Sequence, residues 1–228
     1  MARWGPGNDW GIADGRRRLT REESHARTRE LLLESASRLF AELGVEATPV
    51  EAIAEHAGFS RGAFYSNFAN KDELVVSLIQ SYTEAHLAQS EEIAAAASSS
   101  GTVLFQALFE RAQQRRLDRP WEALLFIEFW LYAARNPTLL PTLQKRVDSR
   151  VKLIEKLVIE RFERMGIDSP AAPDHVAAAV LAIDEGVSLL SMIDPDRYPR
   201  TAFFEVLTFL EGVMTGAPPV DVERSAEA

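Results

Sequence analysis

Apolar residues recur every three or four positions along almost the whole chain, which is the spacing of a helix with one buried face. The alternation of apolar and polar residues that marks a half-buried strand is not found between turns. Breaks rich in Gly, Pro, Ser and Asn divide the pattern into about nine segments. The sequence therefore predicts an all-α fold of about nine helices.

Cap residues indicate where the first four helices begin. A Thr, Ser or Asn followed three residues later by Glu is a capping box, in which the two side chains satisfy backbone amides at the helix start. Boxes of this kind, or single caps, stand at Thr20, Thr48, Ser60 and Asn70. Pro49 suits a first helical position, and glycines such as Gly44 and Gly58 suit helix ends. We expect a short helix from Arg61 to Phe68 and a long one after Asn70.

The later helices and the domain limits follow from equally clear breaks. We expect one helix after Thr102, one from Trp121 to Arg135, a long one ending at Gly166, one ending at Asp194, and one from about Arg200 to Thr215. The predicted units are a flexible basic arm (1–19), a helix-turn-helix domain (20–72), a helical body (73–216) and a flexible tail (217–228).

Composition narrows the class of protein. The 228 residues include no cysteine, which excludes disulfides and thiol chemistry, and the net charge is −9. No signal peptide and no apolar run of membrane length are seen, so we expect a cytoplasmic protein without a membrane partner. Residues 1–72 carry 10 basic and 11 acidic residues and are nearly neutral, whereas the remainder has a net charge of −8. Only the first segment is therefore suited to contact a phosphate backbone.

The segment from Val50 to Phe68 has the pattern of a helix-turn-helix. Two short helices joined by a tight turn containing Gly58 must cross steeply, which leaves the outer face of the second helix in solvent. That face shows Arg61, Tyr65, Ser66 and Asn67. Arginine and asparagine can read base edges in a major groove, while Gly62 allows the backbone to approach phosphates. These residues indicate a DNA-reading helix.

The residues from Arg29 to Leu78 resemble the DNA-binding domain of the tetracycline-repressor (TetR) family. The resemblance departs from the family at Ala63, where Thr is common, and at Ser66-Asn67. The matching positions are Ala36-Ser37-Arg38-Leu39-Phe40, Gly44, Thr48, Val50 to Ala54, Ala57 to Tyr65, Phe68 and Asn70 to Leu74.

The resemblance implies a homodimer that binds palindromic double-stranded DNA, represses transcription and is released by a small molecule. Carried over residue by residue, it implies phosphate contacts for Thr48, Ser60 and Tyr65, and a backbone contact for Lys71. Thr48 and Ser60 are expected to be helix caps whether or not they contact DNA, and the alternative for Tyr65 is an aromatic residue exposed on the surface without a DNA contact. The predicted DNA-binding residues are Thr48, Ser60, Arg61, Gly62, Ala63, Tyr65, Ser66, Asn67 and Lys71.

Basic residues also precede the first predicted helix. The run from Arg16 to Arg18 can serve as an arm that enters a minor groove or contacts phosphates. It can equally be a solubilising tail, and the sequence does not separate the two.

The predicted helix from Trp121 to Arg135 has hardly any polar face, which favours burial on all sides and a pocket wall. Glu128 in its middle suggests a polar anchor for a ligand, or alternatively a core carboxylate paired with Arg111 or Arg115. His86 is either a ligand contact or a satisfied core histidine. The predicted pocket for a hydrophobic small molecule comprises Tyr82, His86, Phe105, Phe109, Trp121, Phe126, Glu128 and Trp130.

The last two predicted helices are more apolar than one chain can cover, which favours a two-fold four-helix interface between two copies. Small residues spaced by four allow close approach, although packing within the chain is the alternative. The predicted interface residues are Ala178, Ala182, Gly186, Leu190, Phe203, Leu207 and Leu210.

Two other functional classes fit less well. The four histidines have no metal-ligand spacing, and no phosphate-binding loop or nucleophile elbow is present, so we expect no enzyme, no cofactor and no metal. A helical interaction module, or an activator without small-molecule control, stays an alternative to the repressor.

Overall fold

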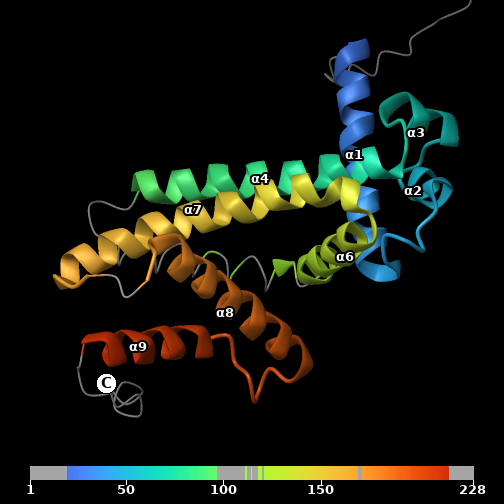
Figure 1. Ribbon diagram of the computed structural model, residues 1–228. Coiled ribbons are helices and arrows are strands. Elements are labelled where there is room, and N and C mark those ends of the chain that lie inside the picture. The colour runs from blue at the N-terminus through green and yellow to red at the C-terminus, as the bar shows by residue number, and fades with distance from the viewer. Residues whose placement is uncertain are drawn as a thin grey trace, which may run out of the picture.

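The computed structural model describes residues 20–96, 111, 114, 118–119, 121–168 and 171–215, and all regular structure in these ranges is helical (Figure 1). The predicted all-α class is therefore confirmed. The predicted arm, the tail, and the helix after Thr102 with Phe105 and Phe109 lie outside the described residues. The helices are α1 (Arg21–Leu43), α2 (Val50–His56), α3 (Arg61–Asn67), α4 (Lys71–Ala96), α6 (Trp121–Arg135), the 3-10 turn η1 (Pro137–Leu139), α7 (Leu140–Met165), α8 (Pro173–Ile193) and α9 (Ala202–Thr215).

Local caps explain most of these boundaries. Thr20 forms the predicted box, with Glu23 N–H donating to its hydroxyl (3.1 Å) and Thr20 N–H donating to the Glu23 carboxylate (2.7 Å). Ser60 accepts from the N–H of Ala63 at the start of α3. At the start of α4, Asn70 accepts from the N–H of Glu73 (2.8 Å), as predicted. Short-range hydrogen bonds of this kind are readable from sequence because both partners lie within one turn.

The predicted capping box at Thr48 is wrong. The residue that precedes α2 is Pro49, and no side chain caps this helix. Thr48 is fully buried, and its hydroxyl donates to the carbonyl of Gly44 (2.7 Å). Its side chain therefore closes the loop between α1 and α2 rather than the first turn of α2.

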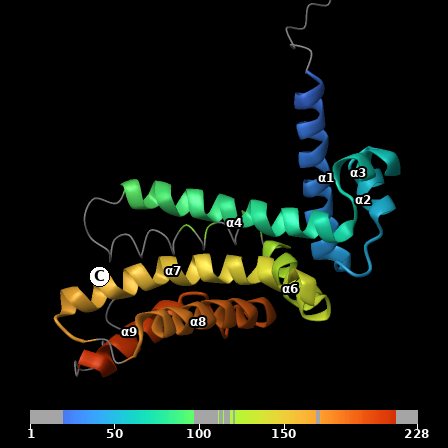
Figure 2. The same cartoon turned by 45° about the horizontal axis from the view of Figure 1, so that its top comes forward.

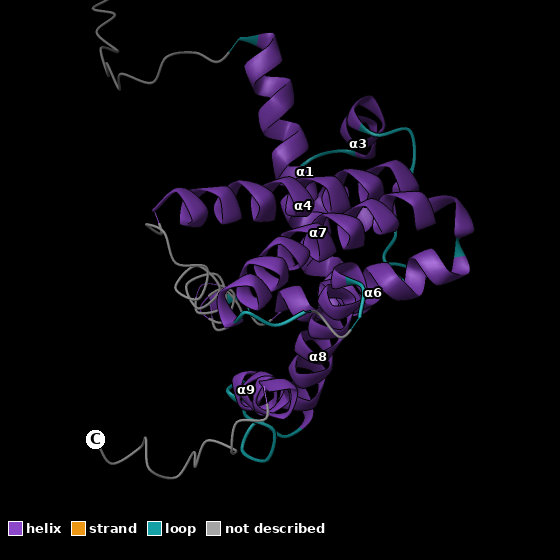
Figure 3. Cartoon of the chain, turned by 60° about the vertical axis from the view of Figure 1, so that its left-hand side comes forward, coloured by secondary structure: helices purple, strands orange, loops and turns teal. Residues whose placement is uncertain are grey.

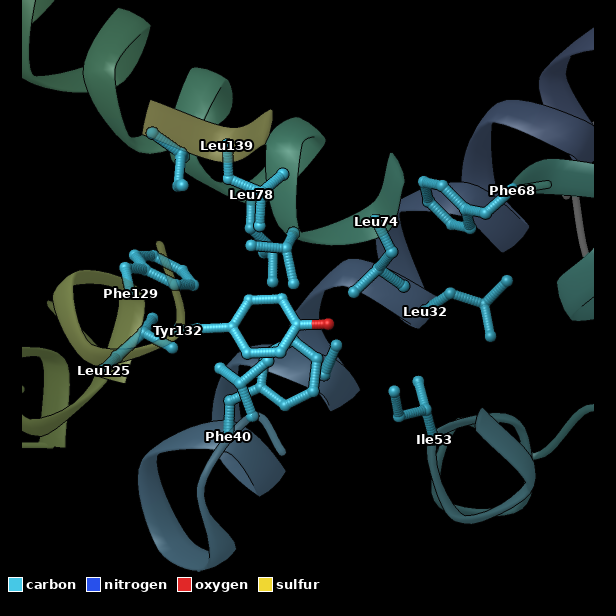
Figure 4. Packing of buried hydrophobic residues seen from close by; sticks show 14 of the residues in the cluster. Leu32, Phe40, Ile53, Phe68, Leu74, Leu78, Leu125, Phe129, Tyr132 and Leu139 are labelled. Carbon is cyan, nitrogen blue, oxygen red and sulfur yellow. The ribbon is translucent and has the colours of Figure 1, made fainter. Parts of the chain in front are cut away.

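One hydrophobic core joins the first three helices to α4 and α6 (Figure 4). Phe40 of α1 and Ile53 of α2 lie in the same cluster as Leu74 of α4 and Phe129 of α6, and all are almost completely buried. Burying a side chain of this size stabilises the fold by roughly 1.5–3 kcal/mol. The start of α4 and one face of α6 are thus built into the core of the helix-turn-helix unit.

The long helices extend from this core and form the rest of the molecule. Figures 1 and 2 show α4 and α7 running side by side from α1, with α8 and α9 on the other side of α7. Viewed from the side, α3 projects at one end of the molecule and α9 lies at the other (Figure 3). The fold therefore separates the predicted DNA-reading helix from the predicted dimer helices.

Helix α8 is long and apolar enough to suit a membrane span, with a mean hydropathy of 1.8 in its best window, of which 22% is buried. One such helix is weak evidence, because core helices of soluble proteins pass the same test. Arg150 of α7 forms ion pairs with Asp184 (3.3 Å) and Glu185 in the middle of α8. These pairs attach α8 to its own chain.

Candidate DNA interface and ligand cavity

Helix α3 is anchored by its aromatic residues and exposes the opposite face. Phe64 and Phe68 are buried with their ring centroids 5.6 Å apart, which fixes the rotation of the helix. Arg61, Gly62 and Ser66 are exposed, and the side chain of Tyr65 is 44% exposed. The predicted outward face of α3 is thus confirmed at Arg61, Gly62, Tyr65 and Ser66, whereas Asn67 is half-buried.

Arg61 and Tyr65 are held next to each other on that surface. The guanidinium of Arg61 lies 5.4 Å from the centre of the Tyr65 ring, and its Nε lies 3.0 Å from the Glu51 carboxylate of α2. A hydrogen bond with Tyr65, followed by the charge of Glu51, raises the pKa of Arg61 above its ordinary value. Arg61 is therefore a solvent-facing cation that lies between Glu51 and Tyr65 in this structure.

Two residues of α1 secure the end of α3 and were missed by the sequence analysis. Arg29 donates to the carbonyl of Asn67 (2.8 Å) and to the hydroxyl of Ser77 (2.7 Å), and it stacks on Phe68 at 4.1 Å. His25 Nε2 lies 3.4 Å from the carbonyl of Ser66. The sequence does contain a signal for the role of Arg29. Arg29 lies one turn before Leu32, on the buried face of α1, so its side chain was placed to contact other helices.

A groove of about 660 Å³ lies between α3 and the first turns of α1. Ala63, Ser66 and Asn67 form its wall on α3, opposite Arg21 and His25 of α1. Ala63 is half-buried there, so this predicted DNA contact lies at the edge of the α3 face rather than at its centre.

Three predicted DNA contacts have structural partners instead. The buried hydroxyl of Thr48 is used within its loop, so the predicted phosphate contact of this side chain is wrong. Lys71 donates to the carbonyls of Val45 (2.9 Å), Glu46 (3.1 Å) and Thr48 (3.3 Å), which uses all three ammonium donors. Asn67 Nδ2 donates to the carbonyl of Ala63 (2.8 Å), one turn back on α3.

A second feature is a cavity of about 480 Å³ that is lined mainly by α4, α6, α7 and α8, together with Arg111 and with Phe203 of α9. Three of its predicted residues, His86, Phe126 and Trp130, line the wall. Tyr82 instead packs edge-on against Phe126 at 5.5 Å, and the guanidinium of Arg38 stacks on Trp121 at 4.3 Å. Neither Tyr82 nor Trp121 belongs to the cavity wall.

Glu128 also lies outside this cavity wall, which corrects the prediction of a polar anchor for the ligand. Its carboxylate accepts a hydrogen bond from the N–H of Val45 (3.1 Å), in the loop after α1. The expectation that α6 is buried on all sides is wrong as well, since Trp130 is 56% exposed.

The polar groups of the cavity come from α7 and α8. Arg146 is almost completely buried, and its guanidinium stacks on Phe126 at 3.9 Å. Arg150, Asp184 and Glu185 form the ion-paired part of the wall, and Glu122, which pairs with Arg119 (3.2 Å), lies on the α6 side. An apolar chamber with a few fixed polar groups is the usual form of a small-molecule site.

The geometry has counterparts among known proteins. Residues 32–78 match the model of bacterial regulatory proteins of the tetR family, and residues 102–210 match the C-terminal model of BetI-type transcriptional repressors. The chain belongs to the TetR family of transcriptional regulators. The resemblance noted from the sequence is thus confirmed.

Individual relatives agree with this family. The transcriptional regulator TtgR of Pseudomonas putida is 46% identical over 69 residues, which cover 30% of this chain and 32% of TtgR. The match thus spans about a third of that relative's length. The regulator TcmR of Streptomyces glaucescens is 27% identical over 170 residues, covering 74% of each chain.

Solved structures share the fold. A transcriptional regulator from Pseudomonas aeruginosa PAO1 superposes with a TM-score of 0.73 at 19% identity, covering 88% of this chain and 94% of that one. The complex of SmeT with triclosan superposes with a TM-score of 0.65 at 21% identity, covering 82% and 91% of the two chains. Both share the arrangement of helices that this chain has.

In this TetR-family chain, α8 and α9 expose several large apolar side chains. Among the predicted interface residues, Ala178, Ala182, Leu190 and Leu210 are exposed, and Gly186 and Leu207 are half-buried. Phe203 is the exception, because it is buried and lines the cavity. The largest further exposed side chains on this face are Ile193 (80%), Val213 (65%) and Phe209 (60%).

Proposed function

We propose that this protein is a repressor that binds a palindromic operator as a homodimer in the bacterial cytoplasm and leaves it when a small hydrophobic molecule enters the cavity. The main support is α4, one continuous helix whose first turns belong to the core beneath α3 and whose later turns line the cavity. A change in the cavity therefore has a rigid path to α3. The relatives named above are regulators, and we propose no catalytic role.

The proposed DNA contacts are those residues that the structure leaves facing solvent. Arg61 and Tyr65 point outward from α3 and suit base edges or phosphates in a major groove, while Ser66 and the N-terminal Ser60 lie beside them. Gly62 lets the backbone approach the duplex. Lys71 and Thr48 are left out because their polar atoms hold the loop before α2.

The proposed effector is an apolar, partly aromatic molecule. The cavity wall combines Phe126, Trp130 and Phe203 with aliphatic residues of α7 and α8. Its volume of about 480 Å³ lies in the range of drug-sized ligand sites. A structural neighbour with the same fold is known in complex with triclosan, a small aromatic compound.

The proposed dimer pairs the exposed faces of α8 and α9 from two copies. Figure 3 shows α3 and α9 at opposite ends of the chain, so pairing through α8 and α9 would leave both α3 helices free to contact one duplex. Two recognition helices about 34 Å apart match successive major grooves. The effector releases the DNA if it binds more tightly to a conformation in which the two α3 helices have a different spacing.

The test begins with DNA selected from a random-sequence pool by the purified protein. We expect a palindromic duplex to be enriched and to be bound by two chains, as measured by fluorescence anisotropy and sedimentation. The apolar fluorophore 1-N-phenylnaphthylamine is then titrated as a cavity probe, and we expect it to bind and to weaken the complex. Enrichment of no sequence, or binding by single chains, contradicts the proposal.

A further inference from the structure

We propose that Glu128 of α6 is a positioning residue that transmits the state of the cavity to the loop before the helix-turn-helix. This inference rests on the function proposed above and names a second connection besides α4. It starts from the contact of the Glu128 carboxylate with the N–H of Val45, which joins two residues 83 positions apart.

The loop between α1 and α2 is held from two sides. Lys71, at the start of α4, donates to the carbonyls of Val45, Glu46 and Thr48. Glu128, on α6, accepts from the N–H of Val45. Val45 itself is completely buried, so its N–H depends on a partner within the protein. The loop position is therefore set jointly by α4 and α6.

The chain makes room for the carboxylate at Gly44. This residue has a φ of +86°, and a Cβ placed on it would lie 3.1 Å from the Glu128 Oε2. A side chain at this position would be strained and would also crowd the carboxylate. The approach of Glu128 to this turn thus depends on a glycine that also ends α1.

The opposite face of α6 lines the cavity. Ala123, Phe126, Ile127 and Trp130 belong to the cavity wall. With 3.6 residues per turn, Glu128 lies on roughly the other side of the helix from these residues. A molecule that displaces the cavity face of α6 therefore moves the carboxylate in the same direction, because the helix is stiff on this length scale.

A further contact ties this face of α6 to the start of α4. The Tyr132 hydroxyl, one turn after Glu128, donates to the Asp72 carboxylate (2.7 Å). Helices α4 and α6, which both carry cavity residues, are thus joined to each other and to the loop that directly precedes α2. Since α2 packs on α3, a shift of this loop changes the position of the reading helix.

The first experiment examines the contact itself in the full-length protein. Glu128→Ala should raise amide exchange at Val45 at least about tenfold and weaken binding to the selected duplex about five- to tenfold. Glu128→Gln keeps an acceptor oxygen and should therefore show amide exchange at Val45 and duplex binding close to those of the wild-type protein. Glu46→Ala removes a carboxylate from the loop itself but leaves the contact of Glu128 with the N–H of Val45 in place, and is the matched control. Unchanged exchange at Val45 in Glu128→Ala overturns the proposal.

The second experiment examines transmission with a filled cavity and needs no effector. Ala123→Phe adds a ring to the cavity face of α6 and should weaken duplex binding about tenfold, but less than about twofold when combined with Glu128→Ala. Equal losses in both backgrounds, or no loss from Ala123→Phe, overturn the role of Glu128. If circular dichroism shows that Ala123→Phe does not fold, Leu153→Phe fills the cavity from α7 instead.

The outcomes separate this inference from the proposed function. If the wild-type protein selects no DNA, the proposed function fails. Amide exchange at Val45 in Glu128→Ala still tests the contact between Glu128 and Val45. If cavity filling weakens duplex binding with and without Glu128, the proposed function stands and α4 alone carries the signal.

Discussion

The two ends of the molecule differ in how completely they bury their apolar residues. In α1 to α3 and the start of α4, the large apolar side chains of the core are almost fully buried, as Phe40, Phe64 and Leu74 show. In α8 and α9, Ile193 is 80% exposed and Phe209 is 60% exposed. The first region is complete within one chain, whereas the second leaves its largest apolar face without cover from the described part of its own chain.

The difference indicates what each end is for. A helix-turn-helix that is rigid by itself can hold Arg61 and Tyr65 in one orientation before DNA arrives. An exposed apolar face costs solubility unless another surface covers it, and the homodimer typical of the family is the cover proposed above. The stability of the DNA-reading end should therefore come from contacts within one chain. The stability of the α8–α9 end should depend on the protein concentration.

The largest expected effect comes from charging the exposed α8–α9 face. Phe209→Asp combined with Val213→Asp should convert the dimer to monomers and weaken operator binding by about a hundredfold or more, because two half-sites no longer bind together. Sedimentation velocity and fluorescence anisotropy measure the two effects. Leu140→Asp, an exposed apolar position on α7, serves as the control. A dimer that survives the double change shows that the interface lies elsewhere.

Changes on α3 should affect DNA binding without affecting the fold. Arg61→Ala should weaken operator binding about tenfold and lower the salt dependence by about one unit, since one cation is removed. Glu51→Gln should strengthen binding about two- to threefold, because it removes the competing carboxylate. Binding as a function of KCl concentration, beside thermal melting, measures both. A large drop in Tm in either variant contradicts the solvent-facing role.

Lys71 should behave in the opposite way to Arg61. Lys71→Ala removes three hydrogen bonds to loop carbonyls and should cost about 2 kcal/mol of stability, or about 5 °C in Tm. The salt dependence of DNA binding should stay unchanged. A loss of one unit in that dependence with an unchanged Tm restores the DNA contact implied by the family resemblance.

The smallest expected effect is at Tyr132. Burial, followed by the hydrogen bond to Asp72, raises the pKa of Tyr132 above the ordinary value of a phenol. Since the folded state keeps the proton longer than the unfolded state, this contribution is present below about pH 10 and is lost as the pH rises further. Tyr132→Phe should lower stability by about 1 kcal/mol at pH 8 and reduce the alkaline loss. Urea unfolding at pH 8 and pH 10.5 tests this, and parallel pH profiles contradict it.

Features that depend on neighbouring residues were predictable from sequence. The caps at Thr20, Ser60 and Asn70 and the span of α6 from Trp121 to Arg135 were predicted correctly, because their determinants lie within one or two turns. The outward face of α3 also followed, since the period of a helix fixes which residues lie opposite Phe64.

The roles of side chains whose partners are distant in the sequence were not predictable from the sequence. Lys71 was assigned to DNA and Glu128 to a ligand, yet both side chains hold the loop at Val45. Phe203 was assigned to the dimer and lies in the cavity. In each case the residue type was informative, but its partner comes from a helix far along the chain. An apolar or charged side chain can form equally favourable contacts with several kinds of partner, so residue type alone does not identify the partner.

By itself, the sequence determined the caps at Thr20, Ser60 and Asn70, the span of α6, the family and the reading face of α3, because these depend on spacing and on hydrogen bonds between near neighbours. The tertiary structure decided which face of α6 meets the cavity, which charges hold the loop before α2, and how much of α8 and α9 stays uncovered. Those properties depend on how the helices cross, and crossing is set by packing across the whole core rather than by any one segment.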